Sequence, residues 1–387
     1  MDKKPEKLVP EVRFKGFTDD WEQRKLGTLF QKNIERNDDE KFNYNQTLSV
    51  STMTFKPNGN GASAKSLANY KVLRLGDVAF EGHPNKQFSY GRFVVNDNAD
   101  GIMSPRFATI RPIKAININY WKNYLHNENI MKYVLVKSTK AGTMMNELVY
   151  SDLYKQVLKV PNITEQVKIG NLLQKIEIII TLQQRKLEQL KLLKKAILQI
   201  IASNGFLLHT KKVDMIKVRV ADIYQITRGN VLARSEISNV QTSKYPYPVY
   251  SSQTKNLGLM GYYKDFLFKN AITWTTDGAN AGTVKYRKGR FYSTNVNGVL
   301  LSSEGLANQL TAELLNLVAF KYVSHVGNPK LMNNTMGEIM FNIPESIETQ
   351  QYFSNCIELV INLIGKQEKA IYKLNKLKKY LLQELFI

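Results

Sequence analysis

Two long segments, each without proline and with a single glycine, Gly170 or Gly365, are the feature that most constrains what this chain can fold into. Each begins shortly after a proline, Pro161 or Pro344, and runs for roughly 40 residues, over 165–203 and 348–386. Acidic residues lie in the first turn of each segment and lysines lie late, as is typical of the two ends of a helix. At 1.5 Å per residue each helix would be about 60 Å long, so it needs a packing partner along its length.

Apolar residues recur at heptad spacing in both segments, and the second segment repeats the register of the first. Adding 184 to the residue numbers of one segment gives the other, and both rows have a glutamine near the middle. Such rows predict that the two helices pair. The first row is Ile169, Ile176, Gln183, Leu190 and Ile197, repeated as Phe353, Val360, Gln367, Leu374 and Leu381. A second row is expected at Leu172, Ile179, Lys186, Leu193 and Ile200, repeated as Cys356, Leu363, Ala370, Leu377 and Glu384.

Three arrangements of these helices are open: an antiparallel pair within the chain, a coiled coil between chains, or packing against another subunit. Each helix follows one large segment, so a globular domain and a long helix alternate twice along the chain. Equivalent helices related by a pseudo-twofold axis must run antiparallel. We therefore favour the antiparallel pair within one chain.

The large segments also repeat, although more weakly. Residues 25–30 resemble residues 219–224, and residues 91–93 resemble residues 289–291. Short β-like runs separated by Gly, Asn, Asp and Pro occupy most of the remaining sequence, and we expect strands within 70–75, 91–95, 247–250, 271–275 and 298–301. We expect an α+β fold, with two pseudo-twofold-related α+β domains joined by two long helices paired as an antiparallel coiled coil. The expected parts are 1–160, 161–204, 205–343 and 344–387.

The charge of the chain points to a polyanionic partner. The 387 residues carry a net charge of +21. Residues 1–160 contain 25 basic and 17 acidic residues, and residues 205–343 contain 16 and 8, so each large segment has a net charge of +8. Charge shared equally by two segments favours nucleic acid contacted by both, although solubility alone would also account for it.

Basic and polar loops supply candidate DNA contacts. In the second half, a run of lysine and arginine follows a loop rich in Gly and Asn, and Arg or Asn beside such loops can contact base edges and phosphates. Any single residue of this kind is also consistent with an exposed hairpin charge. The candidates are Lys86, Arg92, Arg106, Lys140 and Thr143 in the first half, and Arg228, Asn230, Asn280, Lys285, Arg287, Lys288, Arg290 and Lys330 in the second.

No catalytic or metal-binding motif emerges. The four histidines, His83, His126, His209 and His325, have no metal-ligand spacing, and Cys356 is the only cysteine. We find no phosphate-binding Walker loop, no nucleophile elbow and no adenine-methyltransferase motif. The start of the chain lacks the apolar core of a secretory signal, and no apolar stretch is long enough to span a membrane. These observations predict a cytoplasmic, non-catalytic protein without its own cofactor or metal.

Several motifs together resemble the specificity subunits of bacterial type I restriction–modification enzymes. They are residues 10–27, PEVRFKGFTDDWEQRKLG, and the post-proline run through Glu165, Gln166 and 169–173, with the lysine-rich ends of both helices. The second post-proline run, over 347–355, departs from the family pattern.

The resemblance implies a division of labour. Two target-recognition domains would each read one half of a split site in double-stranded DNA. The paired helices would act as a spacer and hold two methylation subunits, and two restriction or motor subunits would join the full complex. S-adenosylmethionine, ATP and Mg²⁺ are then expected on those partners, with methylation of adenine N6 and cleavage carried out there.

The sequence also allows a different class of protein. The chain could be a bivalent DNA-binding scaffold, such as a transposition accessory factor, without any modification partner. Co-purification of a methyltransferase in a two-to-one ratio distinguishes the two. An enzyme with a cryptic active site is disfavoured by the missing motifs.

Overall fold

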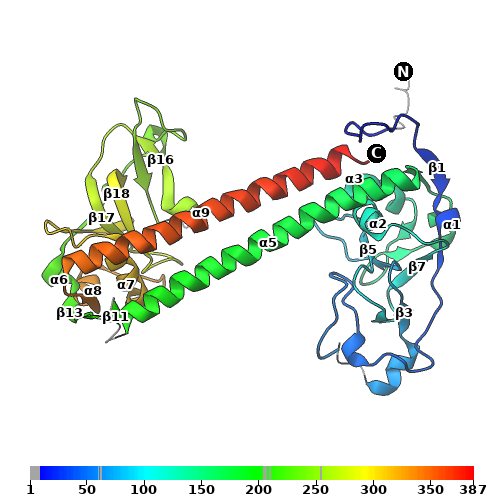
Figure 1. Ribbon diagram of the computed structural model, residues 1–387, viewed down its shortest axis with the longest axis horizontal. Helices are drawn as coiled ribbons and strands as arrows, with labels where there is room; N and C mark the ends of the chain where they lie inside the picture. Colours follow the sequence, from blue (N-terminus) through cyan, green and yellow to red (C-terminus); the bar gives the residue numbers. More distant parts are fainter. Residues whose placement is uncertain (1–8, 60, 62, 204–206, 209–210, 253–254) are drawn as a thin grey trace. The chain divides into compact units, whose positions relative to one another are not determined.

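The computed structural model describes residues 9–59, 61, 63–203, 207–208, 211–252 and 255–387. Contacts divide the chain into two compact units (Figure 1). Unit 1 comprises Met1–Gln184 and Ala370–Ile387, and unit 2 comprises Arg185–Lys369. The boundary expected at residues 204 and 205, like His209, lies outside the described residues, and the expected four-part division stays a prediction.

Unit 1 is built around a four-stranded antiparallel sheet in the order β2-β7-β4-β5. Its core packs Phe30, Phe80 and Phe93 from the sheet against Trp121 and Tyr124. The described elements before the first long helix are β1 (Glu22–Lys25), α1 (Leu26–Leu29), β2 (Phe30–Lys32), η1 (Tyr44–Gln46), η2 (Ala64–Asn69), β3 (Lys71–Leu73), β4 (Val78–Glu81), β5 (Arg92–Val95), β6 (Gly101–Met103), β7 (Ala108–Pro112), α2 (Ile118–Leu125), α3 (Glu128–Leu135), β8 (Thr139–Lys140), β9 (Glu147–Leu148), α4 (Tyr150–Leu153) and β10 (Val157–Val160).

Unit 2 contains a six-stranded sheet in the order β14-β19-β17-β18-β15-β16. Its core packs Ile272, Trp274 and Leu300 from the sheet against Leu310 and Leu314. Its described elements between the long helices are β11 (Leu207–Leu208), β12 (Lys211–Lys212), β13 (Met215–Arg219), α6 (Val220–Ile223), β14 (Gln225–Arg228), η3 (Arg234–Glu236), β15 (Tyr247–Tyr250), η4 (Lys255–Gly258), β16 (Leu259–Tyr263), β17 (Phe268–Thr275), β18 (Val284–Ser293), β19 (Asn297–Leu301), α7 (Gln309–Ala319), η5 (Phe320–Tyr322), α8 (Asn333–Gly337) and β20 (Met340–Pro344).

The two units repeat one topology. In unit 1, β1 pairs with β10 and the sheet runs β2-β7-β4-β5. In unit 2, β13 pairs with β20 and the sheet begins β14-β19-β17-β18 in the same order. The similar segments 25–30 and 219–224 both join a strand end to a one-turn helix. The predicted α+β fold is therefore confirmed, including strands within 70–75, 91–95, 247–250, 271–275 and 298–301.

The two long helices are α5 (Ile163–Ala202) and α9 (Ile347–Glu384), and they contact each other within each unit (Figure 1). In unit 1, Ile169 and Leu173 near the start of α5 share a core with Leu385 at the end of α9. In unit 2, Ile201 near the end of α5 shares a core with Ile357 near the start of α9. The helices therefore run antiparallel within one chain, as favoured from the sequence.

The first predicted heptad row faces inward, but the second row is wrong by one residue. Ile169 and Ile176 are buried, as are Val360 and Gln367, and the other members of the first row are half-buried. The inward partners of this row lie four residues after each member rather than three. They are Leu173, Ile180, Leu187, Lys194 and Ile201 in α5, and Ile357, Ile364, Ile371, Lys378 and Leu385 in α9.

Residues of the rejected row instead form an exposed apolar row on each helix. Ile179 and Leu193 are 43% and 49% exposed, and their equivalents Leu363 and Leu377 are 49% and 45% exposed. Residues three and four positions later lie on neighbouring parts of a helix surface, so the sequence alone allowed either row. Packing against the neighbouring helix and domain selects the row four positions later.

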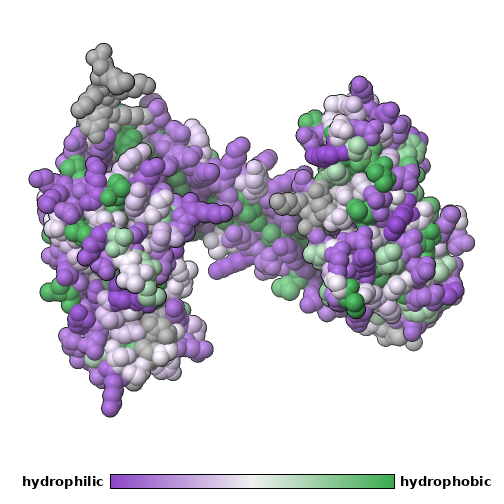
Figure 2. Space-filling view, turned by 180° about the vertical axis from the view of Figure 1, so that it is seen from behind, coloured by the Kyte–Doolittle hydropathy of each residue, from purple (hydrophilic) through white to green (hydrophobic). Residues whose placement is uncertain are grey.

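The face shown in Figure 2 is largely hydrophilic, with scattered apolar side chains. Among the described residues, no helix is long and apolar enough to cross a membrane.

Candidate nucleic-acid interface

The basic run in unit 2 lies on β18, where neighbouring side chains point to opposite faces of the sheet. Lys285 and Arg287 lie on one face, opposite Thr273 and Ala271 of β17. Tyr286 and Lys288 lie on the other face. The run therefore does not act as one cluster, as the sequence suggested, but supplies two surfaces.

Arg287 is buried and is held by three groups. Its guanidinium donates hydrogen bonds from Nε to Thr273 Oγ1 (3.1 Å) and from Nη1 to the Leu257 carbonyl (2.8 Å). It also lies 3.8 Å from the centre of the Tyr250 ring. Burial lowers the pKa of Arg287 to about 10, so the group is charged at neutral pH. Arg287 is thus a recessed cation rather than an exposed side chain.

Lys288 and Arg290 have different surroundings. Lys288 forms an ion pair with Glu358 of α9 (2.7 Å), which connects β18 to the long helix. Arg290 is exposed and lies 4.9 Å from the centre of the Phe266 ring. Both side chains are exposed, but among the described residues Lys288 is paired with a carboxylate and Arg290 is not.

The other unit 2 candidates lie in loops at the ends of the sheet strands. Arg228 ends β14, and the backbone N–H of exposed Asn230 donates to the Ser293 carbonyl (3.0 Å). The backbone of exposed Lys330 forms an isolated antiparallel β-bridge with the backbone of Asp277. Half-buried Asn280 lies in the same loop as Asp277. These residues lie at the same end of the sheet, because β14 and β17 end there and β19 begins there.

Unit 1 places two of its candidates on strands, Arg92 on β5 and Lys140 on β8, and both are paired with carboxylates. Arg92 forms an ion pair with Glu81 across β4 and β5 (2.6 Å) and lies over the Phe88 ring. Lys140 forms an exposed ion pair with Glu147 (3.1 Å). The remaining three, Lys86, Arg106 and Thr143, are exposed. Of the unit 1 candidates, Lys86 and Arg106 are therefore the exposed cations without a carboxylate partner among the described residues.

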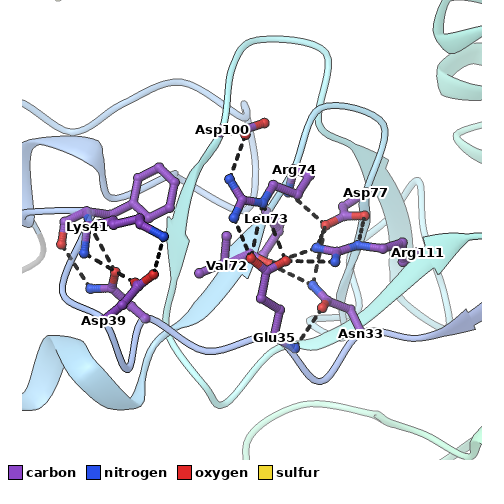
Figure 3. Close-up of polar contacts among 12 residues, drawn as sticks. Asn33, Glu35, Asp39, Lys41, Val72, Leu73, Arg74, Asp77, Asp100 and Arg111 are labelled. Atoms are coloured by element: carbon purple, nitrogen blue, oxygen red, sulfur yellow. Dashed lines mark hydrogen bonds and ion pairs between the residues drawn. The ribbon is translucent and has the colours of Figure 1, made fainter.

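A second polar cluster in unit 1 is closed by its own carboxylates (Figure 3). Arg111 pairs with Asp77 (2.6 Å) and Glu35 (2.7 Å), and Arg74 pairs with Glu35 and with Asp100 (2.9 Å). Burial raises the pKa of Glu35, but hydrogen bonds from Arg74 and Arg111 outweigh it, so this pKa lies below its ordinary value. The cluster joins the segment after β2 to β3 and β7, which is a structural role.

Sequence reasoning missed how each long helix is anchored to its domain. Gln166 and its equivalent Gln350 are both buried. Each donates from Nε2 to the carbonyl of the preceding proline, Pro161 (2.9 Å) or Pro344 (2.8 Å). Gln166 Oε1 also accepts from Trp121 Nε1 (3.1 Å). The signal available was the glutamine repeated at an offset of 184.

The domain helices also contact the long helices at equivalent positions. A Cβ atom added at Gly170 would lie 2.5 Å from Asn117 Oδ1 and 2.9 Å from the Tyr120 nitrogen. At the equivalent position in unit 2, Ser354 Oγ accepts from the Gln309 nitrogen (3.1 Å). In both units the start of a domain helix, α2 or α7, therefore packs closely on a long helix.

The N-terminal segment adds an anchor in unit 1. Arg13 donates to both carboxylate oxygens of Glu165 (2.7 and 2.8 Å), and Glu165 is fully buried at the start of α5. The Val12 nitrogen donates to the Glu384 carbonyl at the end of α9 (3.1 Å). The segment thus fastens the beginning of one long helix and the end of the other.

No metal-binding cluster of His, Cys, Asp or Glu is present in the described parts of the chain. The chemistry that the candidate residues can perform is recognition, through cations, amides and hydroxyls, rather than bond making.

Comparison with known proteins agrees with this geometry. A model of the type I restriction modification DNA specificity domain matches residues 212–376. The N-terminal part of a putative type I specificity subunit from Mycoplasma pneumoniae is 42% identical over 124 residues, which cover 31% of this chain and 65% of that protein. The specificity subunit of the type I restriction enzyme MpnII, from the same organism, is 34% identical over 142 residues, 36% of this chain and 42% of that protein. Each match therefore spans less than two thirds of the relative.

A solved structure shares the fold over nearly the whole chain. The crystal structure of the type I restriction–modification S subunit from M. genitalium superimposes with a TM-score of 0.65, covering 98% of this chain and 99% of that one. Sequence identity is 14%, so this similarity concerns the fold alone. The matched specificity domain and the similar specificity subunits confirm the resemblance seen in the sequence. Residues 212–376 belong to the type I restriction modification DNA specificity domain family.

Proposed function

We propose that the chain selects the DNA site of a type I restriction–modification complex, with the sheet domain of each unit reading one half-site. The observation that carries the proposal is the repeated strand order, β2-β7-β4-β5 and β14-β19-β17-β18, which presents different polar residues in each unit. One scaffold with two sets of loops suits two different half-sites. The chain itself is non-catalytic in this proposal.

The exposed apolar rows support docking of partner subunits on the long helices. Unit 1 contains Ile179 of α5 and Leu377 of α9, and unit 2 contains the equivalent Leu363 of α9 and Leu193 of α5. Exposed apolar side chains at equivalent positions fit two copies of one partner. We propose that these partners are two methylation subunits, that two restriction or motor subunits join them, and that S-adenosylmethionine, ATP and Mg²⁺ bind those partners.

Methylation patterns test half-site reading. The chain is co-expressed with its methylation subunit, and methylated positions are read by single-molecule sequencing. Replacing Arg228 and Arg290 by Ala should relax or lose one half-site, and replacing Lys86 and Arg106 by Ala should affect only the other. Each lost base contact costs about 1–3 kcal/mol of discrimination, roughly 10-fold or more. If each double variant altered both half-sites equally, the division between the units would be wrong.

Native mass spectrometry tests the docking. Leu193→Asp should remove one methylation subunit, Leu377→Asp the other, and the double variant both. Tyr133→Asp, at an exposed position on α3 (62%), is the matched control and should leave two subunits bound. Normal helix content with two subunits still bound to the double variant would contradict the docking surface. A chain that never captures a methylation subunit would favour the DNA-binding scaffold instead.

A further inference from the structure

A group of polar side chains is buried on one face of the unit 2 sheet, where apolar residues would normally lie. Along β17, Ile272 and Trp274 point into the core, whereas Thr273 and Thr275 point to the opposite face. Thr273, Thr275 and Asn297 are 2%, 7% and 2% exposed, and Arg287 is 7% exposed. Hydrogen bonds within the group offset the free-energy cost of this burial: Thr273 Oγ1 accepts from Arg287 Nε and donates to the Lys285 carbonyl (3.4 Å), and Asn297 Nδ2 donates to Ser293 Oγ (3.4 Å).

The end of β18 closes the sheet around this face. The Asn230 nitrogen donates to the Ser293 carbonyl (3.0 Å), and the Thr294 nitrogen donates to the Tyr250 carbonyl (3.0 Å). The hydroxyl groups of Thr294 and Ser251 are 3.1 Å apart. These contacts enclose a small cavity of about 10 Å³, room for one water-sized group, lined by Ser251, Thr273, Thr275, Lys285, Arg287 and Asn297.

The cavity holds two cations and no carboxylate. Among the residues that the structure describes, neither Lys285 nor Arg287 forms an ion pair, and none of the residues lining the cavity is acidic. Burial lowers the pKa of Lys285 to about 8, and the nearby charge of Arg287 acts in the same direction. The carboxylate of Glu313, which forms an ion pair with Lys194, acts in the opposite direction. Two partly desolvated cations side by side are unfavourable unless an anion joins them.

Unit 1 shows the contrasting case. There the buried cations Arg74 and Arg111 are each balanced by two carboxylates (Figure 3). A cation cluster that serves only to hold the fold together is thus neutralised within this same chain. Among the described residues, the unit 2 cations form no ion pair of this kind, Glu313 being paired with Lys194, and hydroxyl and amide groups surround the open space.

We infer that this cavity binds one oxygen of a phosphate group, with Lys285 and Arg287 supplying the charge and the surrounding hydroxyls and Asn297 supplying hydrogen bonds. The inference rests on the proposed function, because DNA is the source of phosphate that it implies. Cations with hydroxyl and amide donors are the usual ligands of phosphate oxygens. The exposed candidate Asn230 lies beside the cavity through its bond to Ser293, so a bound backbone would also pass Asn230.

Thermal unfolding of the full chain tests the site with inorganic phosphate as the probe. Phosphate is compared with chloride at equal ionic strength and pH 7. At ten times its dissociation constant, bound phosphate should raise the Tm of unit 2 by about 3–5 °C. Lys285→Gln should abolish this shift, Lys285→Arg should retain it, and Lys269→Gln, at an exposed position on the same sheet, should leave it unchanged.

Two results would overturn the site. Phosphate that stabilises the unaltered chain no more than chloride does would mean that the cavity holds only water. An unchanged phosphate effect in a folded Lys285→Gln variant would place any bound phosphate elsewhere. If Lys285→Gln fails to fold, the retained shift in Lys285→Arg and its loss in Thr275→Val still decide the question.

DNA binding then identifies the source of the phosphate. Fluorescence anisotropy with a duplex should show that Lys285→Gln lowers the slope of log K against log salt by about one. Phosphate should compete with the duplex for the unaltered chain more strongly than chloride does. Phosphate binding without such competition would uphold the anion site and reject DNA as its ligand. Failure of DNA binding with intact phosphate binding would count against the proposed function alone.

Discussion

Glu177 allows a quantitative test of how unit 1 is held to both long helices. Its Oε2 lies 2.7 Å from Lys122 Nζ on α2, and its Oε1 accepts from Lys378 Nζ on α9 (2.8 Å). Glu177 itself belongs to α5, so one carboxylate joins three helices. Lys122 has a second partner in Asp97 (3.1 Å), whereas Lys378 has no other ion pair in the described residues.

The change Glu177→Gln removes the shared charge while keeping the shape. A hydrogen bond to a charged group contributes about 1.5–3 kcal/mol. The side chain of Glu177 is 26% exposed, which weakens each of the two bonds, and the amide oxygen of Gln retains one weaker bond. We therefore expect a loss of about 2 kcal/mol, which lowers the Tm of a unit of this size by roughly 4–8 °C.

The partners of Glu177 make the effect asymmetric. Lys378→Met should cost less than Glu177→Gln, because Glu177 keeps Lys122 when Lys378 is lost. In the Glu177→Gln background, Lys378→Met should cost almost nothing or even stabilise, since it removes a lysine without a partner. Calorimetry of the four chains gives the coupling free energy directly. A coupling of zero, with Lys378→Met equally costly in both backgrounds, would refute the reasoning.

The pH dependence supplies an independent check with a definite sign. Burial raises the pKa of Glu177, but the hydrogen bonds from Lys122 and Lys378 outweigh it, and the pKa lies below its ordinary value of 4.5. A lowered pKa in the folded state stabilises the fold above pH 4.5, and this stabilisation is lost as pH falls through the lowered value. The difference between the unaltered chain and Glu177→Gln should therefore be full at pH 7 and shrink below pH 4.5.

Further predictions concern single contacts. Gly170→Ala should destabilise unit 1 by about 1–3 kcal/mol because its Cβ atom would clash with the backbone of α2, whereas Gly365→Ala, with nothing within 4 Å, should stabilise α9 by about 0.5–1 kcal/mol in the same melting assay. Gln350→Ala should cost about 1–3 kcal/mol and speed hydrogen exchange at the start of α9, because the Pro344 carbonyl loses its buried partner; unchanged exchange there would contradict this anchoring role. Burial lowers the pKa of His126, so stability should fall as pH drops below 6.5, and His126→Gln should flatten that dependence in urea titrations.

Much of the architecture could be predicted because it depends on local pattern. A proline followed by a long proline-free amphipathic run predicted α5 and α9 to within a few residues. Short β-like runs separated by Gly and Asn predicted β5, β15, β17 and β19. The environments of the candidate contacts could not be predicted in the same way. Arg287 and Lys288 are adjacent in sequence, yet one is buried against Tyr250 and the other pairs with Glu358. Their surroundings depend on sheet register and on a residue 70 positions away.

The misplaced second row has a physical cause that also links the fold to the proposed docking. Both helices contain adjacent apolar pairs, 172–173 and 179–180 in α5, and 356–357 and 363–364 in α9. The later member of each pair faces the partner helix or the domain core. In the second pair of each helix, the earlier member, Ile179 or Leu363, remains exposed. A helix that needed only its internal partner would be expected to carry polar residues at the outer positions. Doubling the apolar residues makes the inner row ambiguous in the sequence, and it also supplies the outer row that a second protein can cover. The same residues that misled the heptad assignment are therefore the ones where substitution should separate subunit capture from folding.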